Sequence, residues 1–320
     1  MSADGAGIAA AVEALRSGEV VGLPTETVYG LAADALDPVA VAKIFEAKER
    51  PRFDPLIVHL PDREWLERLT ATPKEDGALV EKLVTEFWPG PLTLVLPRTS
   101  AVPDIVAAGL ETVAVRISAH PVFSAVLRLF GGPLAAPSAN RFGRISPTAA
   151  AHVAEELEGR IGLIIDGGAA THGLESTIVA VRNSRLELLR RGPVTVEQLH
   201  AFAEVSESQS GVLEAPGQLP SHYAPRTRLL LLDHPQEFAG DRSRAGFLAF
   251  RGRPEGPEFA AVRVLSAEGD LREAAANLFR CLRELDGLQL ESIVAEALPN
   301  EGLGSAIMDR LTRAAQSRGG

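Results

Sequence analysis

The sequence is poor in several residue types, and each scarcity excludes a class of protein. It has a single Cys, which excludes a disulfide framework and a Cys-rich zinc site and suits a reducing compartment. It has no run of about 18 uninterrupted apolar residues to span a bilayer. No basic start leads into an apolar stretch, as in a secretory signal. We therefore expect a cytoplasmic protein without a membrane anchor.

Positive charge is also in deficit, with 32 Lys and Arg against 42 Asp and Glu and a net charge of −10. Residues 1–200 hold 19 basic and 25 acidic side chains, and residues 201–320 hold 13 and 17. Neither half is therefore a basic module. The balance argues against a protein that coats nucleic acid, although it leaves a local basic pocket possible.

The order of apolar and polar segments predicts two α/β domains. Residues 1–200 alternate short apolar runs with helical patterns, which indicates a largely buried sheet covered by helices. Residues 201–225 are polar and rich in Gly, Pro and Ser, which is typical of a linker. Residues 226–320 again alternate strand and helix patterns, which predicts a small Rossmann-like α/β domain.

Common catalytic signatures are missing from the sequence. There is no phosphate-binding G-x-x-x-x-G-K-[ST] loop, no G-x-G-x-x-G after a first strand, no G-x-S-x-G elbow and no H-E-x-x-H. Candidate chemistry therefore has to be sought in polar clusters at the predicted ends of strands, where α/β sheets place ligands.

Two such clusters lie in the first 60 residues. The segment 22–34, GLPTETVYGLAAD, places Thr27 and other hydroxyls after an apolar strand, as either a ligand site or a polar turn. Lys48 and Arg50 end a predicted helix over residues 37–50. They either complement the helix dipole or grip a polyphosphate. His59 follows in an apolar strand, where a packed core residue is the simpler interpretation.

Three further clusters follow. Arg116 interrupts the apolar strand TVAVRIS and must be paired with an anion, which either the protein or a ligand supplies. The segment 136–148, APSANRFGRISPT, combines hydroxyl, amide and guanidinium groups that suit phosphate binding. Its Ser146-Pro147-Thr148 sequence also suits plain helix capping. Ser176 opens one predicted strand, and Arg190 ends another.

These blocks together resemble a known family. GLPTETVYGL, KIFEAKERPRFDPLIVHL, TVAVRI, APSANRFGRISPT, STIV and LRRGPV are similar in order and spacing to the threonylcarbamoyl-AMP synthase family of the YrdC/Sua5 type, over residues 8–195. APGQLPSHYAP (215–225) resembles the linker of its long, two-domain Sua5 form. PNEGLGSAIMDRLTRAA (299–315) resembles the end of the Sua5 C-terminal domain.

The resemblance implies a fold, a reaction and partners. The fold is a YrdC-like twisted sheet with helices around a concave active site, plus the small second domain. The enzyme is a nucleotidyltransferase that condenses L-threonine, bicarbonate or CO2 and ATP into threonylcarbamoyl-AMP and pyrophosphate, assisted by Mg2+. A separate tRNA threonylcarbamoyl-transferase complex then uses the product for tRNA t6A modification, so little direct tRNA binding is expected.

The resemblance also implies a role for individual residues, while it leaves metal ligands unassigned. Those implied for catalysis are Lys48 and Arg50. Those implied for L-threonine are Thr27, His59, Arg116, Ala136 and Ser176. Those implied for ATP are Arg50, Asp54, Thr112, Ser138, Asn140, Ser146, Arg190, His222 and Tyr223, the last two in a linker that closes over the site. Asp54 stands where many relatives carry Asn. A carboxylate there repels phosphate unless it faces Mg2+ or the ribose.

Two alternatives remain open. A related carbamoyl-adenylate enzyme, as in hydrogenase maturation, belongs to much longer chains with acylphosphatase-like and zinc-finger segments, which this sequence lacks. A double-stranded RNA-binding module is the alternative from another class, and the net charge of each half speaks against it.

Overall fold

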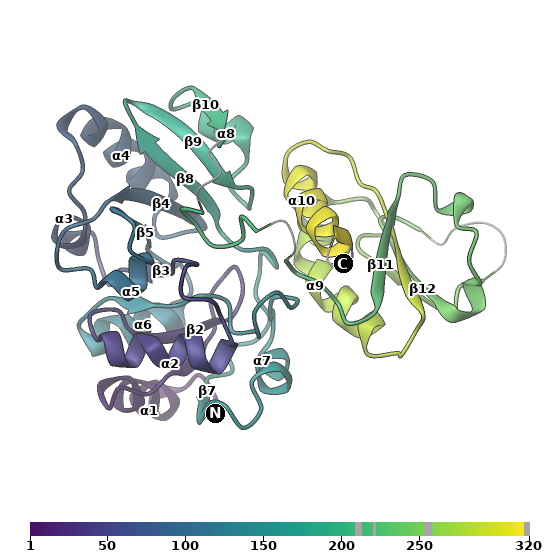
Figure 1. Ribbon diagram of the computed structural model, residues 1–320, viewed down its shortest axis with the longest axis horizontal. Helices are drawn as coiled ribbons and strands as arrows, with labels where there is room; N and C mark the ends of the chain where they lie inside the picture. Colours follow the sequence, from purple (N-terminus) through teal and green to yellow (C-terminus); the bar gives the residue numbers. More distant parts are fainter. Residues whose placement is uncertain (209–212, 220–221, 253–257, 317–320) are drawn as a thin grey trace. The chain divides into compact units, whose positions relative to one another are not determined.

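The alternating pattern of the sequence forms two separate sheets in the computed structural model, which describes residues 1–208, 213–219, 222–252 and 258–316 (Figure 1). The chain divides into two units. The first unit comprises Met1–Phe142, Pro147–Ala170 and Glu175–Gln218. The second unit comprises Gly143–Ser146, Thr171–Leu174 and Leu219–Gly320.

The first unit contains a ten-stranded mixed sheet and eight helices among the described residues. The sheet order is β10-β9-β8-β4-β5-β3-β6-β2-β1-β7. The strands are β1 (Val21–Leu23), β2 (Gly30–Asp34), β3 (Ile57–His59), β4 (Leu92–Pro97), β5 (Thr112–Arg116), β6 (Leu134–Ala135), β7 (Leu163–Ile164), β8 (Thr177–Arg182), β9 (Arg185–Arg190) and β10 (Val205–Glu207). The helices are α1 (Gly5–Arg16), α2 (Pro38–Lys48), α3 (Glu64–Leu69), α4 (Lys74–Phe87), α5 (Asp104–Ala107), α6 (Pro121–Phe130), α7 (Ala150–Glu156) and α8 (Val196–His200).

The parallel and antiparallel pairs of this sheet fix where the strand ends lie. β3 runs parallel to β5, and β4 runs parallel to β8, while β4 and β5 are antiparallel. Apolar side chains from these central strands and from α2 and α4 form one core. β10 lies within the predicted linker and pairs in parallel with β9, so the first unit runs on to Gln218.

Local sequence explains how α2 begins and ends. The Asp37 side chain accepts a hydrogen bond from the backbone N–H of Val39, and Pro38 takes the first helical position, as the sequence predicts. Glu49 follows Lys48 in a left-handed conformation (φ 53°), which ends the helix. Lys48 and Arg50 are thereby placed at the helix terminus.

One predicted helix start is wrong. Ser146 and Thr148 do not cap the helix that follows them, because α7 begins at Ala150 and Ala149 makes no side-chain capping bond. The carbonyls of Pro147 and Thr148 instead accept long-range bonds from the backbone N–H groups of Tyr29 (2.8 Å) and Ala170 (2.9 Å). Pro147 and Thr148 are therefore bonded into the first unit.

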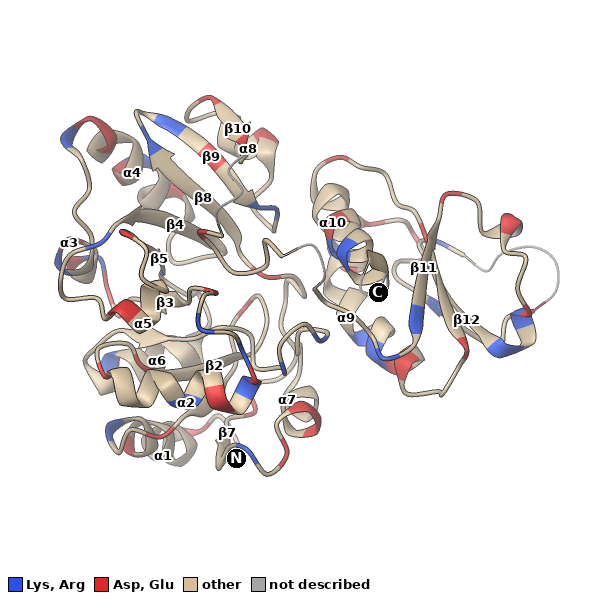
Figure 2. Cartoon of the chain, in the orientation of Figure 1, with Lys and Arg blue, Asp and Glu red and all other residues tan. Residues whose placement is uncertain are grey.

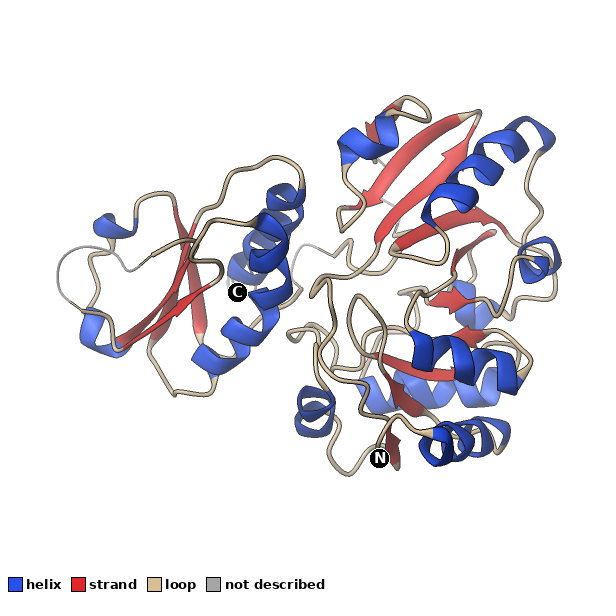
Figure 3. Cartoon of the chain, turned by 180° about the vertical axis from the view of Figure 1, so that it is seen from behind, coloured by secondary structure: helices blue, strands red, loops and turns tan. Residues whose placement is uncertain are grey.

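Among its described residues, the second unit has a four-stranded parallel sheet in the order β11-β14-β12-β13. Its two α-helices pack against each other beside the strands (Figure 3). The elements are β11 (Arg228–Leu232), β12 (Ala245–Ala249), β13 (Ala261–Val264), β14 (Ser292–Glu296), α9 (Leu271–Asp286), α10 (Leu303–Ala315) and two 3-10 turns, η1 (Pro235–Glu237) and η2 (Arg242–Arg244). No helix in the described part of the chain is long and apolar enough to cross a membrane.

Candidate active site

The ends of strands β3 and β5 bring three of the predicted threonine-binding residues together. His59 pairs in register with Arg116 at the ends of these parallel strands. Arg116 Nη1 donates a hydrogen bond to Thr27 Oγ1 (3.0 Å), and Thr27 lies in the loop after β1. All three side chains are buried. The cluster therefore lies at a strand end, where α/β sheets bind ligands.

Each nitrogen of the Arg116 guanidinium group faces a protein oxygen. Nε donates to the Gly90 carbonyl (2.9 Å), Nη1 donates to Thr27, and Nη2 lies 2.6 Å from Glu26 Oε1. A buried Arg needs an anion, and the sequence left open whether the protein or a ligand supplies it. In the structure the protein itself supplies this anion, which is the carboxylate of Glu26.

Glu26 is fixed as firmly as its partner. It accepts hydrogen bonds from Ser118 Oγ (2.5 Å) and the Ala119 backbone N–H (3.0 Å). Burial raises the pKa of Glu26, but the charge of Arg116 and these hydrogen bonds outweigh burial and lower the pKa to about 2. Glu26 is therefore ionised at neutral pH. Sequence reasoning omitted Glu26 and Ser118 from the site, although Glu26 is the one carboxylate in the polar segment 22–33.

His59 is a neutral imidazole at physiological pH. Its ring packs against Phe123, with ring centroids 4.6 Å apart, and its side chain is buried. Burial and, second, the charge of Arg116 lower the pKa of His59 to about 3, against the opposing effect of Glu26. His59 is thus suited to packing and hydrogen bonding, and it does not supply a positive charge to the site.

This assignment gives a prediction for pH dependence. We expect the imidazole resonances of His59 to show no titration between about pH 5 and 8, because the folded protein disfavours the charged ring. In denaturant the same ring should titrate near its ordinary pKa of about 6.5. The measurement is an NMR pH titration, with the His59→Gln variant used to assign the resonance. A folded-state midpoint above pH 5 would contradict a neutral His59.

Ser176 and Arg190 form a second cluster beside the first. Arg190 donates from Nε to the Ser176 carbonyl (3.0 Å) and from Nη2 to Ser176 Oγ (3.0 Å). Thr93 Oγ1 lies 2.7 Å from the same hydroxyl. The pair joins one residue predicted for threonine with one predicted for the nucleotide. Ala136, also predicted for threonine, lies directly after β6, and its N–H donates to the Ile57 carbonyl (3.0 Å).

Lys48 holds the loop that follows β6. Its Nζ donates to the carbonyls of Ser138 and Asn140, each at 2.5 Å, and the Phe142 N–H donates back to the Lys48 carbonyl (2.8 Å). The side chain is fully buried, and burial together with the charge of Arg50 lowers the pKa of Lys48 well below its usual range. Lys48 therefore holds the predicted nucleotide loop in place, in surroundings that disfavour its charged form.

Arg50 and Asp54 form a buried ion pair. Arg50 Nη2 lies 3.0 Å from Asp54 Oδ2 and donates to the Pro55 carbonyl (2.8 Å), and both side chains are at most 3% exposed. The predicted nucleotide residue Asp54 thus lies against the predicted phosphate-binding Arg50. Both residues lie beyond the end of α2, so their four-residue spacing is not a helical spacing and did not predict this pairing.

Four predicted nucleotide residues are not grouped with these clusters. Thr112 begins β5, opposite Pro97, and lies about 13 Å along the strand from Arg116 at the usual rise per residue. Ser146, His222 and Tyr223 belong to the second unit. Their roles toward the nucleotide stay predictions.

The second unit holds His222 and Tyr223 of the linker motif tightly. Tyr223 has a left-handed backbone (φ 66°), which is unusual for a non-Gly residue. Its ring stacks on Phe279 (centroids 5.6 Å apart), and the Arg310 guanidinium lies 5.0 Å from the ring centroid. The centroids of the His222 and Tyr223 rings lie 4.2 Å apart. Pro220 and Ser221 of the same motif lie outside the described residues.

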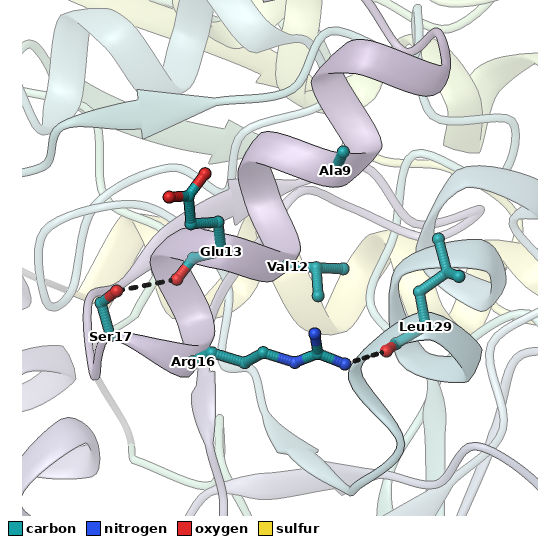
Figure 4. A pocket seen from close by; sticks show the side chains of 6 residues that line it. All are labelled: Ala9, Val12, Glu13, Arg16, Ser17 and Leu129. Carbon is teal, nitrogen blue, oxygen red and sulfur yellow. Dashed lines mark hydrogen bonds between the residues drawn. The ribbon is translucent and has the colours of Figure 1, made fainter.

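A surface pocket of about 420 Å³ lies apart from these clusters, between α1 and α6 (Figure 4). Arg16 reaches across it and donates from Nη2 to the Leu129 carbonyl (2.6 Å). Its lining residues are Ala9, Val12, Glu13, Arg16, Ser17 and Leu129, none of which was predicted for the site.

Comparison with known proteins covers almost the whole chain. A family model described as "Telomere recombination" (Sua5, YciO and YrdC) matches residues 13–192. A second, described as "Threonylcarbamoyl-AMP synthase, C-terminal domain", matches residues 194–316. The chain is 40% identical to threonylcarbamoyl-AMP synthase of Pyrococcus abyssi, over 95% of this chain and 92% of the relative. It is 41% identical to the Bacillus subtilis enzyme of that name, over 97% and 93%.

The fold agrees with a solved structure of the same kind. The crystal structure of P. abyssi Sua5 complexed with L-threonine matches with a TM-score of 0.88 and 38% identity. The match covers 97% of this chain and 94% of that one. Both units of the chain thus have counterparts in the P. abyssi protein, whose structure was solved with L-threonine bound.

Proposed function

The chain belongs to the Sua5/YrdC family of threonylcarbamoyl-AMP synthases, and from this membership we propose how its strand-end clusters perform the reaction. The enzyme condenses L-threonine, bicarbonate or CO2 and ATP into threonylcarbamoyl-AMP and pyrophosphate, a nucleotidyl transfer. The observation that carries this function is the sequence identity of 40% and 41% to named synthases over at least 95% of this chain. The buried Arg116–Glu26 cluster, in a fold shared with a threonine-bound relative, supports the placement of the amino acid.

Arg116 binds the threonine carboxylate in this proposal. An Arg presents five N–H donors in a rigid plane, so the group can keep its protein contacts and still meet a second anion. Glu26 fixes the orientation of the guanidinium through their ion pair of 2.6 Å. Thr27, the neutral His59, Ser176 and the Ala136 backbone line the rest of the threonine pocket. A fixed cation binds a carboxylate without first having to become ordered.

The chemistry requires no protein nucleophile. The threonine amine forms a bond to the carbon of CO2 and loses a proton to solvent, which gives a carbamate. A carbamate oxygen then attacks the α-phosphorus of ATP in line, and the bond to the bridging oxygen breaks as pyrophosphate leaves. Catalysis therefore rests on positioning and charge stabilisation. Lys48, Arg50 and Arg190 supply positive charge toward the phosphates, and Lys48 also holds the Ser138–Asn140 loop.

Mg2+ fits this site as an ion that arrives with the nucleotide. Among the described residues no group of three or more His, Cys, Asp or Glu could hold a metal. Mg2+ is commonly held by one or two carboxylates plus substrate phosphates. Asp54 offers one buried carboxylate beside Arg50. When bound, the ion neutralises charge that develops on the phosphates.

The remaining nucleotide contacts rest on the resemblance. Thr112, Ser138, Asn140 and Ser146 line the nucleotide in this proposal, and the linker closes over it with His222 and Tyr223 to exclude water. We further propose that the enzyme acts in the cytoplasm. It passes its product to a tRNA threonylcarbamoyl-transferase complex and does not hold tRNA itself.

The distribution of charge favours this enzyme over an RNA-binding module. Lys and Arg are scattered together with Asp and Glu over both units (Figure 2). The net charge of −10 further weakens attraction to a polyanion. RNA binding that weakens with salt, in a protein without ATP turnover, is the result that would favour the alternative.

A pyrophosphate-release assay tests the proposed reaction. With ATP and Mg2+ present, we expect release only when both L-threonine and bicarbonate are added, because the carbamate is the nucleophile. The adenylate product should appear in equal amount by mass spectrometry. Release that continues without threonine or without bicarbonate would refute the proposed reaction.

A further inference from the structure

Asp54 is a carboxylate among the basic side chains that are proposed to bind phosphate. It lies in the turn after Arg50, where its N–H donates to the Pro51 carbonyl (3.3 Å), and its side chain is 2% exposed. Oδ2 lies 3.0 Å from Arg50 Nη2 as an ion pair. Apart from this ion pair with Arg50, Oδ2 has no hydrogen-bond donor among the described residues. An ionised oxygen this buried is costly without donors, so the contact with Arg50 alone explains it incompletely.

The electrostatic surroundings of Asp54 are the proposed phosphate-binding cations. Burial raises the pKa of Asp54, and the charges of Arg50, Lys48 and Arg190 oppose that rise. When Asp54 is ionised, this group of side chains carries one positive charge fewer than it would with an amide at this position. The carboxylate thus reduces the attraction of the site for any polyphosphate.

The carboxylate reduces the attraction of the site more for a metal-free nucleotide than for the magnesium complex of the nucleotide. Free ATP carries about four negative charges near neutral pH and its magnesium complex about two, so a fixed carboxylate repels the free form about twice as strongly. Its carboxylate oxygen is also of the type that Mg2+ prefers as a ligand. Both effects act in the same direction.

We propose that Asp54 makes the phosphate subsite selective for the metal complex of the nucleoside triphosphate over the metal-free form. The proposal rests on the assignment of Lys48, Arg50 and Arg190 to the triphosphate. Asp54 opposes the bare triphosphate through its charge and gives the bound Mg2+ one protein oxygen. In the absence of nucleotide it orients Arg50 through the ion pair.

Calorimetry with a non-hydrolysable ATP analogue tests this selectivity. The dissociation constant is measured with Mg2+ and with EDTA for the unmodified protein and for Asp54→Asn. We expect Asp54→Asn to bind the metal-free analogue about tenfold more tightly while its affinity for the Mg2+ complex changes much less. The ratio of the two constants should therefore shrink. Asp104→Asn, at a side chain 82% exposed, is the matched charge control and should leave the ratio unchanged.

The outcomes separate this inference from the proposed function. An Asp54→Asn protein that weakens both forms equally shows that Asp54 only orients Arg50, and an unchanged ratio also overturns the inference while leaving the synthase assignment intact. Failure of the unmodified protein to bind the analogue at all would instead count against the proposed function. Asp54→Ser, which removes the same charge with a smaller side chain, provides the measurement if Asp54→Asn does not fold.

Discussion

Replacing Arg116 by alanine is expected to weaken L-threonine binding by about 100-fold or more, the loss expected for two charge-assisted hydrogen bonds to a carboxylate. Binding of an ATP analogue should change little, because the proposed phosphate cations Lys48, Arg50 and Arg190 make no hydrogen bond or ion pair with Arg116 among the described contacts. Calorimetry with each ligand separately measures the two effects. An equal loss of both affinities would refute the assignment of Arg116 to threonine.

The same substitution should destabilise the fold, because it leaves Glu26 buried without its cation. Breaking one side of a buried ion pair costs about 3–5 kcal/mol. The pKa of Glu26 is depressed in the folded protein to about 2. The stabilisation from its ionised form is therefore complete above the ordinary pKa of about 4.5 and is lost as the pH falls toward 2. The stability difference between the variant and the unmodified protein should accordingly be large at pH 7 and shrink below about pH 4.

A double variant separates binding from stability. Glu26→Gln with Arg116→Met removes both charges, so neither is left unpaired, and denaturation should recover much of the lost stability. Threonine binding should stay weak in this double variant, because the cation is still missing. Arg128→Ala, at an exposed position on α6, is the control for loss of a guanidinium group. Recovery of threonine binding in the double variant would show that Arg116 acts only on the fold.

The sequence predicts the elements of this fold better than it predicts the contacts between them. The helix from Pro38 to Lys48 has a local cap and a local stop, so its limits follow from neighbouring residues. The predicted start of α7 is wrong, because the carbonyls of Pro147 and Thr148 accept hydrogen bonds from residues far away in the chain. No local pattern contains that information.

The candidate site shows the same division. The strand-end positions of Thr27, His59 and Arg116 follow from alternation and turns, and the resemblance supplies their roles. The anion of Arg116 could not be identified from the sequence, because Glu26 reaches it only after β5 and the loop following β1 are placed together. The contact between Arg50 and Asp54 belongs with it, because both residues lie in the irregular segment after α2, where a spacing of four residues does not imply a contact.

The largest effect on the nucleotide side is expected for Lys48→Met. This substitution removes a buried amino group and leaves the carbonyls of Ser138 and Asn140 without their 2.5 Å donor, at a cost of about 1–3 kcal/mol for each. The loop that carries the nucleotide contacts should shift, and a displacement of about 1 Å is sufficient to lower kcat/KM for ATP about 100-fold. Steady-state pyrophosphate release at saturating threonine and bicarbonate, with ATP varied, measures this change in kcat/KM.

Lys43 provides the matched control on the same helix. Its Nζ pairs with Glu19 at 2.7 Å, but the side chain is 36% exposed, so Lys43→Met removes a surface pair worth about 0–1 kcal/mol. Kinetic constants should be nearly unchanged in Lys43→Met. A similar loss of activity in both variants would mean that general destabilisation of α2, and not the loop contact, explains the Lys48 effect.

Lys48→Arg then distinguishes charge from positioning. Arginine keeps the positive charge, but its planar fork does not reproduce a compact ammonium that donates to two carbonyls in a fully buried space. If the positive charge alone acts on the triphosphate, arginine should restore most of the affinity for ATP. If Lys48 acts by holding the Ser138–Asn140 loop, Lys48→Arg should remain as defective as Lys48→Met. The two short hydrogen bonds to backbone carbonyls favour the second result, because a donor already committed to the loop is not free to follow the phosphate.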